Sequence, residues 1–567
     1  MTARITRDTA IPHADLPAFD VETLRGRRAD QRWNRMSVGD MLERVTWSRP
    51  DRTALVGWDG AFSHPRFERM TYREADEAAN QVAHALLDER LSPGDRVLLY
   101  CDNSVEAILL FFGIAKAGMV AVPVNPLLAA DVLAWSIGQV APSLVVADAA
   151  LVDRGADVFT EHGLTPRVTI EIGGVAVPGS VGFSQWLEGR PTTEVDVEIH
   201  GDDIWELLFT SGTTSMPKAS MTAHSYGYLS SYVYAMSLTR GLTYESDLVM
   251  GTFLPIVYHC GHNSTVLPAI ISGGTAVIGR RPDDRALAQA ITRERITAIW
   301  AGSPLWVRKL VEVAEALPDE IDLSSLTVTM FSWGATTPDL FPRLKRMAGG
   351  DVALLEVFGQ TESQSCFRFW PDAEPARAEE SFRGVNHVGL PTPLLAADIH
   401  DPAGRSLAGQ VGVSGEAVYR SPMITQGYYR NPDATAEAFR DGWFHSGDAC
   451  QYVGGADRAQ VMVDRFKDIV KSGGENVSSV RVEGVLAQHP GVSRVAVVGI
   501  PDPTWGEVVT AVVIPVPGAG VSAEELIAFA RERLAGYETP KKVIFTDTMP
   551  ETVGGKIRKH ELRAKIV

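Results

Sequence analysis

The chain has 567 residues, of which 45% are hydrophobic and 22% are charged; this is a globular composition and excludes a disordered chain. A formal net charge of −17, with no block of basic residues, argues against a nucleic-acid-binding protein. The 4 cysteines form no CxxC pair, which argues against a disulfide framework and a cysteine-rich zinc site. No apolar signal segment opens the chain, and we expect a cytoplasmic protein.

Helical and strand patterns alternate along the first two thirds of the chain. Apolar spacing predicts helices over 72–89 and 104–117, and short apolar runs predict buried strands at 96–101, 120–124 and 144–147. The longest apolar stretch, 107–124, contains Lys116, so it predicts a buried helix running into a buried strand rather than a membrane span. The same alternation returns over 248–279 and 299–349. We therefore predict an α/β fold with two βα-layered subdomains built on parallel sheet.

The residue pattern changes near residue 384, where turn-forming residues become frequent and apolar runs become short. This pattern predicts a small β-rich subdomain over about 384–463, which ends an N-terminal region of residues 1–463. Residues 464–567 read as a small α+β C-terminal domain. Its expected elements are helices near 477–489 and 523–534 and strands at 492–500 and 508–516. A hinge is expected near residue 467.

The strongest local motif is TSGTTSMPK, residues 210–218, which follows the apolar run 204–209. Hydroxyls, a flexible glycine and a lysine close together are suited to binding phosphate oxygens. It is not a Walker A loop, because Pro217 and Ala219 flank the lysine. An ordinary Ser/Thr-rich surface turn is the alternative interpretation.

Four further motifs follow in order. FGQTE ends in Glu362, a carboxylate suited to Mg²⁺, although a solvated loop residue is the ordinary interpretation. The other three are GWFHSGD at 442–448, DRFKDIVKSGGENV at 464–477 and PETVGGKIRK at 550–559, which alone would read as turns or charged surface. Their occurrence together in one chain favours a functional reading.

In this combination the sequence resembles the adenylate-forming (ANL) superfamily of acyl-CoA synthetases, nonribosomal peptide adenylation domains and beetle luciferases. Stretches such as MTYREADEAANQVAHAL, HVGLPTP, GYYRNPDATAEAF and VVGIPDPTWGE extend the resemblance from about Met41 to Leu562. The resemblance implies a large N-terminal region, a mobile C-terminal domain and an active site between them. It also implies two half-reactions: a carboxylate attacks the α-phosphate of ATP to give an acyl-adenylate and pyrophosphate, and an acceptor, commonly the thiol of CoA, then displaces AMP.

The resemblance implies an ATP site assembled from several motifs. Its members are Thr210, Ser211, Gly212, Thr213, Thr214, Lys218, Gly334, Ala335, Glu356, Phe358, Asp448 and Arg465. The residues from Thr210 to Lys218 match the loop that holds the β- and γ-phosphates. Gly334, Ala335, Glu356 and Phe358 match positions around the adenine. Asp448 matches the carboxylate that accepts the ribose hydroxyls, and Arg465 matches a second ribose contact.

Three residues match roles in the first half-reaction. Lys556 matches the catalytic lysine, Thr361 the α-phosphate contact, and Glu362 the Mg²⁺ ligand. Charges placed in advance near the α-phosphate would stabilise the transition state preferentially.

Four residues match the hinge and the second half-reaction. Lys467 matches the hinge position, and rotation there would withdraw the catalytic lysine and bring residues 472–477 to the site. Gly473 and Gly474 would allow close backbone approach, and Lys471 matches a position used in the second step, with a surface lysine as the alternative.

The resemblance places the acyl pocket around Tyr258, His259, Trp333 and Gly359. Trp333 stands where glycine is usual in a segment that lines the pocket, so an indole there predicts a small or aromatic acid. The alternative is that the indole packs into the core. His259 is displaced by one residue from the usual PxxH spacing of the family.

Histidines close to this segment do not predict a metal site. His259, Cys260 and His262 are close in sequence, but no fourth ligand stands at a recognised spacing.

The leading functional hypothesis is an AMP-forming acid–thiol ligase that uses ATP, Mg²⁺ and CoA or a separate carrier protein. The alternative is a biosynthetic enzyme of the same fold that forms amides or activates nitrite to diazotise an aryl amine. A third hypothesis, a non-catalytic adenylate-binding protein, is disfavoured by intact Lys556, Glu362 and Asp448. A homodimer is expected by analogy only.

Overall fold

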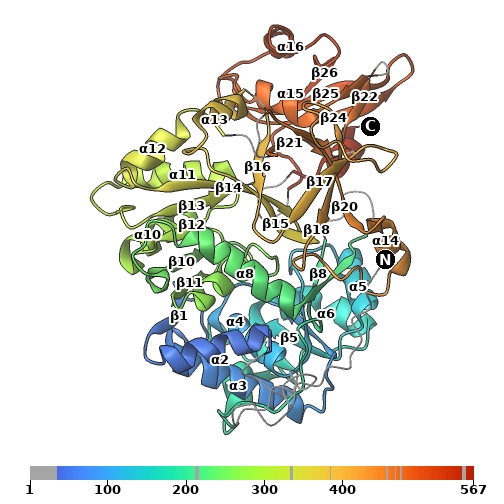
Figure 1. The fold of residues 1–567 in the computed structure, drawn as a ribbon. Helices are drawn as coiled ribbons and strands as arrows, with labels where there is room; N and C mark the ends of the chain where they lie inside the picture. Colours follow the sequence, from blue (N-terminus) through green and yellow to red (C-terminus); the bar gives the residue numbers. More distant parts are fainter. Residues whose placement is uncertain are drawn as a thin grey trace, which may run out of the picture.

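A computed structural model of the protein describes residues 35–210, 216–332, 336–383, 385–454, 458–465, 468–472, 475–551 and 557–566. Two large sheets with their helices form the lower and middle parts of the molecule, and a smaller sheet lies at the top, near the C-terminus (Figure 1). The predicted α/β class is confirmed. Within the described ranges, no helix is both long and apolar enough to cross a membrane.

The first sheet is almost entirely parallel. Its strands, in spatial order, are β7 (Val181–Gly182), β6 (Val168–Ile170), β5 (Leu144–Asp148), β3 (Arg96–Tyr100), β4 (Val120–Pro123), β8 (Ile204–Phe209) and β9 (Ala219–Ala223). The predicted buried strands are confirmed as β3, β4 and β5. The exception to the parallel order is β9, which pairs antiparallel with β8, so the phosphate-loop motif connects the two strands of a hairpin.

The second sheet is mixed. Its strands, in spatial order, are β17 (Ala396–His400), β18 (Gly415–Arg420), β20 (Trp443–Tyr452), β21 (Gln460–Arg465), β16 (His387–Pro391), β15 (Ser363–Phe369), β14 (Ala353–Gln360), β13 (Val328–Phe331), β12 (Ala298–Trp300), β10 (Val249–Thr252), β11 (Thr275–Gly279), β1 (Thr53–Trp58) and β2 (Arg69–Thr71), with β19 (Phe439–Arg440) on β20.

The parallel arrangement predicted for the βα-layered part is found within the second sheet, which is mixed as a whole. Strands from β11 to β14 are parallel, whereas those from β15 to β18 are antiparallel. The change follows from connection length, because a hairpin can join only antiparallel strands. The strands expected as a β-rich subdomain therefore continue the second sheet.

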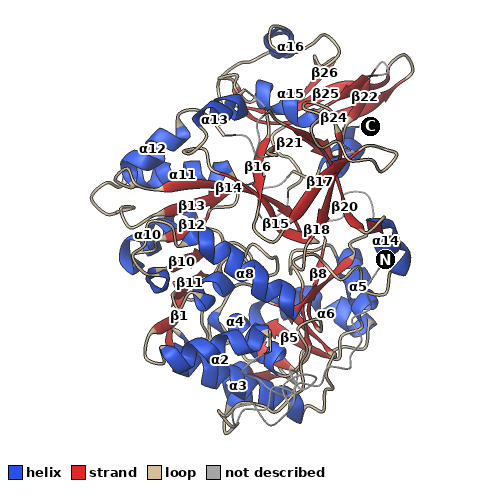
Figure 2. Ribbon diagram, in the orientation of Figure 1, coloured by secondary structure: helices blue, strands red, loops and turns tan. Residues whose placement is uncertain are grey.

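Helices lie on both faces of the sheets (Figure 2). The apolar core that joins the two sheets takes its helical members from α2 (Val38–Ser48), α3 (Tyr72–Asp88), α4 (Val105–Lys116), α7 (Phe183–Leu187), α8 (His224–Leu238) and α9 (Val266–Ile271). Separate cores pack α5 (Ala130–Val140) and α6 (Val152–Glu161) on the first sheet, and α10 (Asp284–Glu294), α11 (Pro304–Ala316) and α12 (Leu340–Met347) on the second. The remaining helices of this part are α13 (Pro375–Phe382) and α14 (Pro432–Ala438).

Lys116, which interrupts the longest apolar stretch, is 1% exposed at the end of α4. Its Nζ lies 2.8 Å from Asp76 Oδ1 and 2.6 Å from Glu194 Oε1. A buried ammonium needs such partners, because burial disfavours an isolated charge. The prediction of a buried helix running into the buried strand β4 is confirmed.

The C-terminal sheet contains β23 (Glu475–Val477), β22 (Val470–Ser472), β25 (Gly506–Pro515), β24 (Val492–Asp502) and β26 (Lys542–Phe545). Its helices are α15 (Ser479–Leu486), α16 (Ala523–Arg531) and α17 (Lys559–Ile566). The predicted helix over 477–489 is shorter than expected, because Ser478 caps it by accepting a hydrogen bond from the Arg481 N–H.

Candidate active site

Two of the predicted catalytic residues lie in a tight turn. β14 ends at Gln360 and β15 begins at Ser363, so Thr361 and Glu362 alone connect these antiparallel strands. The sequence interpretation placed Glu362 at the end of a strand; the structure places it in this hairpin turn. The turn is anchored from below, because the Thr361 carbonyl accepts hydrogen bonds from His259 Nε2 at 3.0 Å and from the Tyr226 hydroxyl at 3.4 Å.

Glu362 and Lys218 meet at one aromatic ring. The Tyr428 hydroxyl donates a hydrogen bond of 2.7 Å to Glu362 Oε1, and the Lys218 ammonium lies 4.2 Å from the centroid of the Tyr428 ring. Burial and the charge of Glu362 raise the pKa of the Tyr428 hydroxyl well above its ordinary value, so it stays a donor. The arrangement places a carboxylate at the hydroxyl and an ammonium over the ring of one tyrosine, which is compatible with binding a cation and a phosphate.

Backbone pairing explains why Tyr428 reaches this position. Residues 425–429 lie along β9: the Met221 N–H donates to the Gly427 carbonyl at 2.9 Å, and Ser220 and Tyr428 form an antiparallel bridge. The Thr425 N–H also donates to the Glu362 carbonyl at 2.7 Å. One segment therefore links the strand that follows the phosphate-loop motif to the Thr361–Glu362 turn.

Asp448 and Arg465 are neighbours in the sheet. They face one another in the β20–β21 ladder, and Arg465 Nε lies 2.6 Å from Asp448 Oδ1. Asp448 raises the pKa of the Arg465 guanidinium, and Glu362 adds a smaller contribution of the same sign. The predicted ribose pair is thus close enough to the Thr361–Glu362 turn to share its electrostatic environment.

Glu356, Phe358 and Gly359 lie on β14, one strand ahead of the turn. Glu356 and Phe358 are two residues apart, so they share one face of the sheet. Desolvation raises the pKa of the Glu356 carboxyl to about 8. Phe358 packs against Phe367 of β15, with ring centroids 6.2 Å apart, and Gly359 is exposed.

Tyr258 and His259 lie in the loop between β10 and α9. His259 has no ring nitrogen left for a substrate, because Nε2 contacts the Thr361 carbonyl and Nδ1 lies 2.6 Å from Asn263 Nδ2. Burial lowers the pKa of His259 to about 4, so the ring is neutral at ordinary pH. This geometry makes His259 a support of the turn, and its place at the acyl pocket stays a prediction. The Tyr258 hydroxyl accepts a 2.9 Å hydrogen bond from Asn125 Nδ2.

Several predicted residues lie outside the described ranges. They are Ser211, Gly212, Thr213, Thr214, Trp333, Gly334, Ala335, Lys467, Gly473, Gly474 and Lys556.

The segments that flank Lys556 are described. Glu551 and Ile557 form an antiparallel bridge, and the Arg558 charge partly offsets the raised pKa of the Tyr258 hydroxyl. Lys471 differs, because its side chain is exposed on β22.

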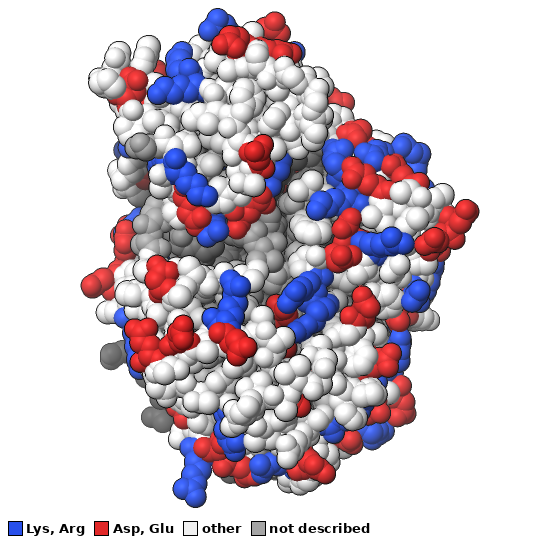
Figure 3. Space-filling model, turned by 180° about the vertical axis from the view of Figure 1, so that it is seen from behind, with Lys and Arg blue, Asp and Glu red and all other residues white. Residues whose placement is uncertain are grey.

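The face of the molecule seen in Figure 3 carries basic and acidic side chains interspersed, with a recess midway down.

Three residues of this region were missed by sequence reasoning: Tyr428, Glu206 and Asn263. Tyr428 belongs to the stretch GYYRNPDATAEAF, which carries the resemblance, but nothing in the local pattern shows that it faces Glu362. Glu206 lies inside the apolar run of β8. A carboxylate within such a run was the available signal, because an unpartnered buried charge is costly.

Comparison with known families decides the assignment. The family model described as AMP-binding enzyme matches residues 42–429, and the model of the AMP-binding enzyme C-terminal domain matches residues 481–556. The chain belongs to the AMP-binding enzyme family. It is therefore an ATP-dependent, AMP-forming ligase of the ANL superfamily.

Individual relatives agree with this family assignment. A feruloyl-CoA synthase from Amycolatopsis sp is 33% identical over 500 residues, which cover 88% of this chain and 94% of that protein. The long-chain-fatty-acid–CoA ligase FadD13 of Mycobacterium tuberculosis is 29% identical over 92% of this chain and 98% of that protein. The amide bond synthetase McbA from Marinactinospora thermotolerans matches in structure with a TM-score of 0.78 and 27% identity, covering 94% of this chain and 100% of that one.

Proposed function

We propose that this enzyme activates a small or aromatic carboxylic acid as an acyl-adenylate and transfers the acyl group to CoA. The observation that carries the proposal is the meeting of Lys218 and Glu362 at Tyr428, with strand β16 between β15 and the β20–β21 ladder that holds the Asp448–Arg465 pair. The acid–CoA ligases among the relatives support transfer to CoA.

In this proposal the chain binds and orients ATP before any bond changes. Lys218 and the hydroxyls from Thr210 to Thr214 bind the β- and γ-phosphates, and the carboxylate of Asp448, held by Arg465, accepts the ribose hydroxyls. Glu356 and Phe358, on one face of β14, flank the adenine, with Gly334 and Ala335 nearby in this assignment. Such fixed donors and charges cost little reorganisation when the α-phosphate is attacked.

Glu362 is the proposed ligand of Mg²⁺. Its carboxylate supplies the hard oxygen donors that Mg²⁺ prefers, and the Tyr428 hydroxyl takes Oε1, which leaves Oε2 for the cation. Bound with ATP, Mg²⁺ supplies positive charge beside the phosphates. Thr361 contacts the α-phosphate and Lys556 stabilises the charge that develops there.

The proposed second half-reaction needs a change of domain position. Residues 1–463 and 464–567 are the proposed moving parts, with Lys467 as hinge. Burial raises the pKa of the Tyr258 hydroxyl, and the charge of Arg558 in the C-terminal region acts to lower it, which supports an approach of this region to the site. Rotation would exchange Lys556 for Gly473, Gly474 and Lys471, the last of which lies on β22.

The substrate class rests on Trp333. We propose that its indole shortens the acyl pocket beside Gly359, and the feruloyl-CoA synthase relative, whose name denotes an aromatic acid, supports this choice over a long fatty chain. The test is thioester formation from CoA with benzoate-type, short-chain and long-chain acids. Trp333→Gly is expected to raise kcat/KM for longer acids at least tenfold, and an unchanged chain-length preference would contradict the pocket assignment.

A second candidate function is amide synthesis or nitrite activation on the same fold. The structural similarity to McbA, an amide bond synthetase, supports amide synthesis as this second candidate. CoA dependence discriminates between the two candidates, because an enzyme of the second kind would turn over and release AMP with an amine, or with nitrite, in the absence of CoA.

A further inference from the structure

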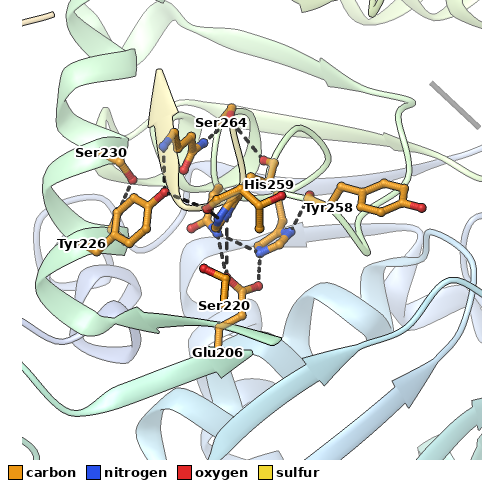
Figure 4. A network of polar contacts seen from close by, with 12 residues as sticks. Glu206, Ser220, Tyr226, Ser230, Tyr258, His259 and Ser264 are labelled. Atoms are coloured by element: carbon orange, nitrogen blue, oxygen red, sulfur yellow. Dashed lines mark hydrogen bonds and ion pairs between the residues drawn. The ribbon is translucent and has the colours of Figure 1, made fainter. Parts of the chain in front are cut away.

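A cluster of buried polar side chains lies beneath the Thr361–Glu362 turn. It consists of Glu206 from β8 and His259, His262 and Asn263 from the loop before α9 (Figure 4), and we call it the Glu206 cluster. Glu206 and Asn263 are 0% exposed, His262 is 1% exposed and His259 is 8% exposed. Phe111 stacks on His262 with ring centroids 4.4 Å apart, so the surroundings are apolar and a buried polar atom without a partner is costly there.

Hydrogen-bond partners fix the protons of His262. Its Nδ1 lies 3.0 Å from the Tyr258 carbonyl, which can only accept, so Nδ1 carries a proton. Its Nε2 contacts Glu206 Oε1 at hydrogen-bond distance. A carboxylate and an unprotonated ring nitrogen would repel each other, so one proton lies between the two groups.

The remaining hydrogen bonds connect Glu206 to the Thr361–Glu362 turn and fix where the proton of His259 lies. Asn263 Nδ2 lies 2.9 Å from Glu206 Oε2 and 2.6 Å from His259 Nδ1, and it donates one N–H to each. The reverse orientation of the amide would place two acceptors together at Glu206, which excludes it. His259 Nδ1 is therefore an acceptor, so Nε2 carries the proton and donates to the Thr361 carbonyl.

Glu206, His259 and His262 could in principle hold a metal ion, since one potential ligand atom of each lies within 4.8 Å of the other two. Asn263 Nδ2 is 3.0 Å from His262 Nε2 as well as close to the other two ligand atoms. The amide thus fills the position that a cation would take. The geometry is that of a hydrogen-bond relay.

We propose that Glu206 and Asn263 are positioning residues, which act through His259 to hold the Thr361 carbonyl, and with it the Thr361–Glu362 turn, at a fixed distance from β8. Since β8 leads directly into Thr210 and the phosphate-loop motif, the relay sets the phosphate loop and the proposed Mg²⁺ ligand relative to each other. The expected consequence rests on the proposed first half-reaction. None of these side chains is required to touch the substrate.

The test compares two substitutions of Glu206 in the full-length enzyme. In Glu206→Gln the amide can donate to His262 Nε2 and accept from Asn263, so the relay survives and kcat for ATP–pyrophosphate exchange should stay within about threefold of wild type. Glu206→Ala and Asn263→Ala leave buried groups without partners, and kcat should fall at least about tenfold, with KM for the acid nearly unchanged.

Glu106→Ala is the matched control. Glu106 is likewise a fully buried carboxylate, but it accepts its hydrogen bond from the Ser63 N–H and has no contact with the relay. It should lower the melting temperature as Glu206→Ala does, yet leave kcat per folded enzyme unchanged. Unchanged kcat in Glu206→Ala, or equal losses in Glu206→Gln and Glu206→Ala, would overturn the proposal. Stoichiometric zinc in purified wild-type enzyme that is lost in Glu206→Gln would also overturn it.

A second readout separates this proposal from the proposed function. If none of the carboxylic acids tested supports ATP–pyrophosphate exchange by the wild-type enzyme, the proposed function fails. MgATP should nevertheless still raise the melting temperature of the wild-type enzyme. That rise should be retained in Glu206→Gln and reduced in Glu206→Ala. A full rise in Glu206→Ala would overturn the positioning role.

Discussion

At the scale of single residues, Tyr428 shows how much of the site depends on one hydroxyl. It binds Glu362 Oε1 on one side and lies under the Lys218 ammonium with its ring. The residue is set by backbone pairing with β9 rather than by its own sequence neighbours. Its contribution can therefore be tested without disturbing the fold.

Tyr428→Phe removes the hydrogen bond and keeps the ring. We expect KM for MgATP to rise by about tenfold, because a hydrogen bond to a charged group contributes about 1.5–3 kcal/mol. Steady-state kinetics with varied MgATP measures this. Tyr452→Phe is the matched control, since that hydroxyl donates a 2.8 Å hydrogen bond to Asp398 within the β17–β20 region. Equal KM values in both variants would contradict the role of Tyr428.

The Glu356 carboxyl predicts a pH dependence of stability. Desolvation raises its pKa from 4.5 to about 8, so the folded protein holds this proton more tightly than the unfolded chain. The contribution of this carboxyl to the free energy of unfolding is complete below the unfolded-state pKa. It is lost as pH rises toward the folded-state pKa, by at most about 1.4 kcal/mol per pH unit. In urea unfolding of the nucleotide-free enzyme across roughly pH 5 to 8, the free energy of unfolding should depend less steeply on pH in Glu356→Gln than in wild type. Parallel curves for the two proteins would contradict the assignment.

At the scale of elements, the site depends on the loop between β10 and α9. The loop folds back on itself: the Gly261 N–H donates to the Tyr258 carbonyl at 2.9 Å, and a Cβ on Gly261 would lie 2.1 Å from the Pro255 carbonyl oxygen. The close approach of the two loop ends is what brings His259 under the turn.

Gly261→Ala should open this loop. Overpacking of this kind costs about 1–3 kcal/mol, and the shift should also weaken the contact between His259 and Thr361. We expect a lower melting temperature together with at least a tenfold loss of pyrophosphate exchange. Gly138→Ala on α5 is the control: its Cβ would have the nearest neighbour at 3.6 Å, so it should be neutral or slightly stabilising. Wild-type exchange in Gly261→Ala would show that the loop does not position the turn.

At the scale of the whole molecule, the sequence predicted local elements better than their assembly. The helix over 72–89 and the strands at 96–101 and 120–124 were found because apolar spacing reports burial directly. The continuous second sheet was missed, since hydrogen bonding between distant strands leaves no local pattern. Likewise the motifs predict the residues of an ATP site, whereas the Glu206 cluster joins residues more than fifty positions apart and became visible only in the fold.

The most direct test of the account is ATP–pyrophosphate exchange with a panel of carboxylic acids and, in parallel, nitrite, for wild type and Lys556→Ala. The account predicts exchange with a small or aromatic acid, a loss of at least about a hundredfold in Lys556→Ala, and thioester formation once CoA is added. Exchange with nitrite alone, or turnover unchanged in Lys556→Ala, would contradict the central claim that this enzyme forms an acyl-adenylate at the site described.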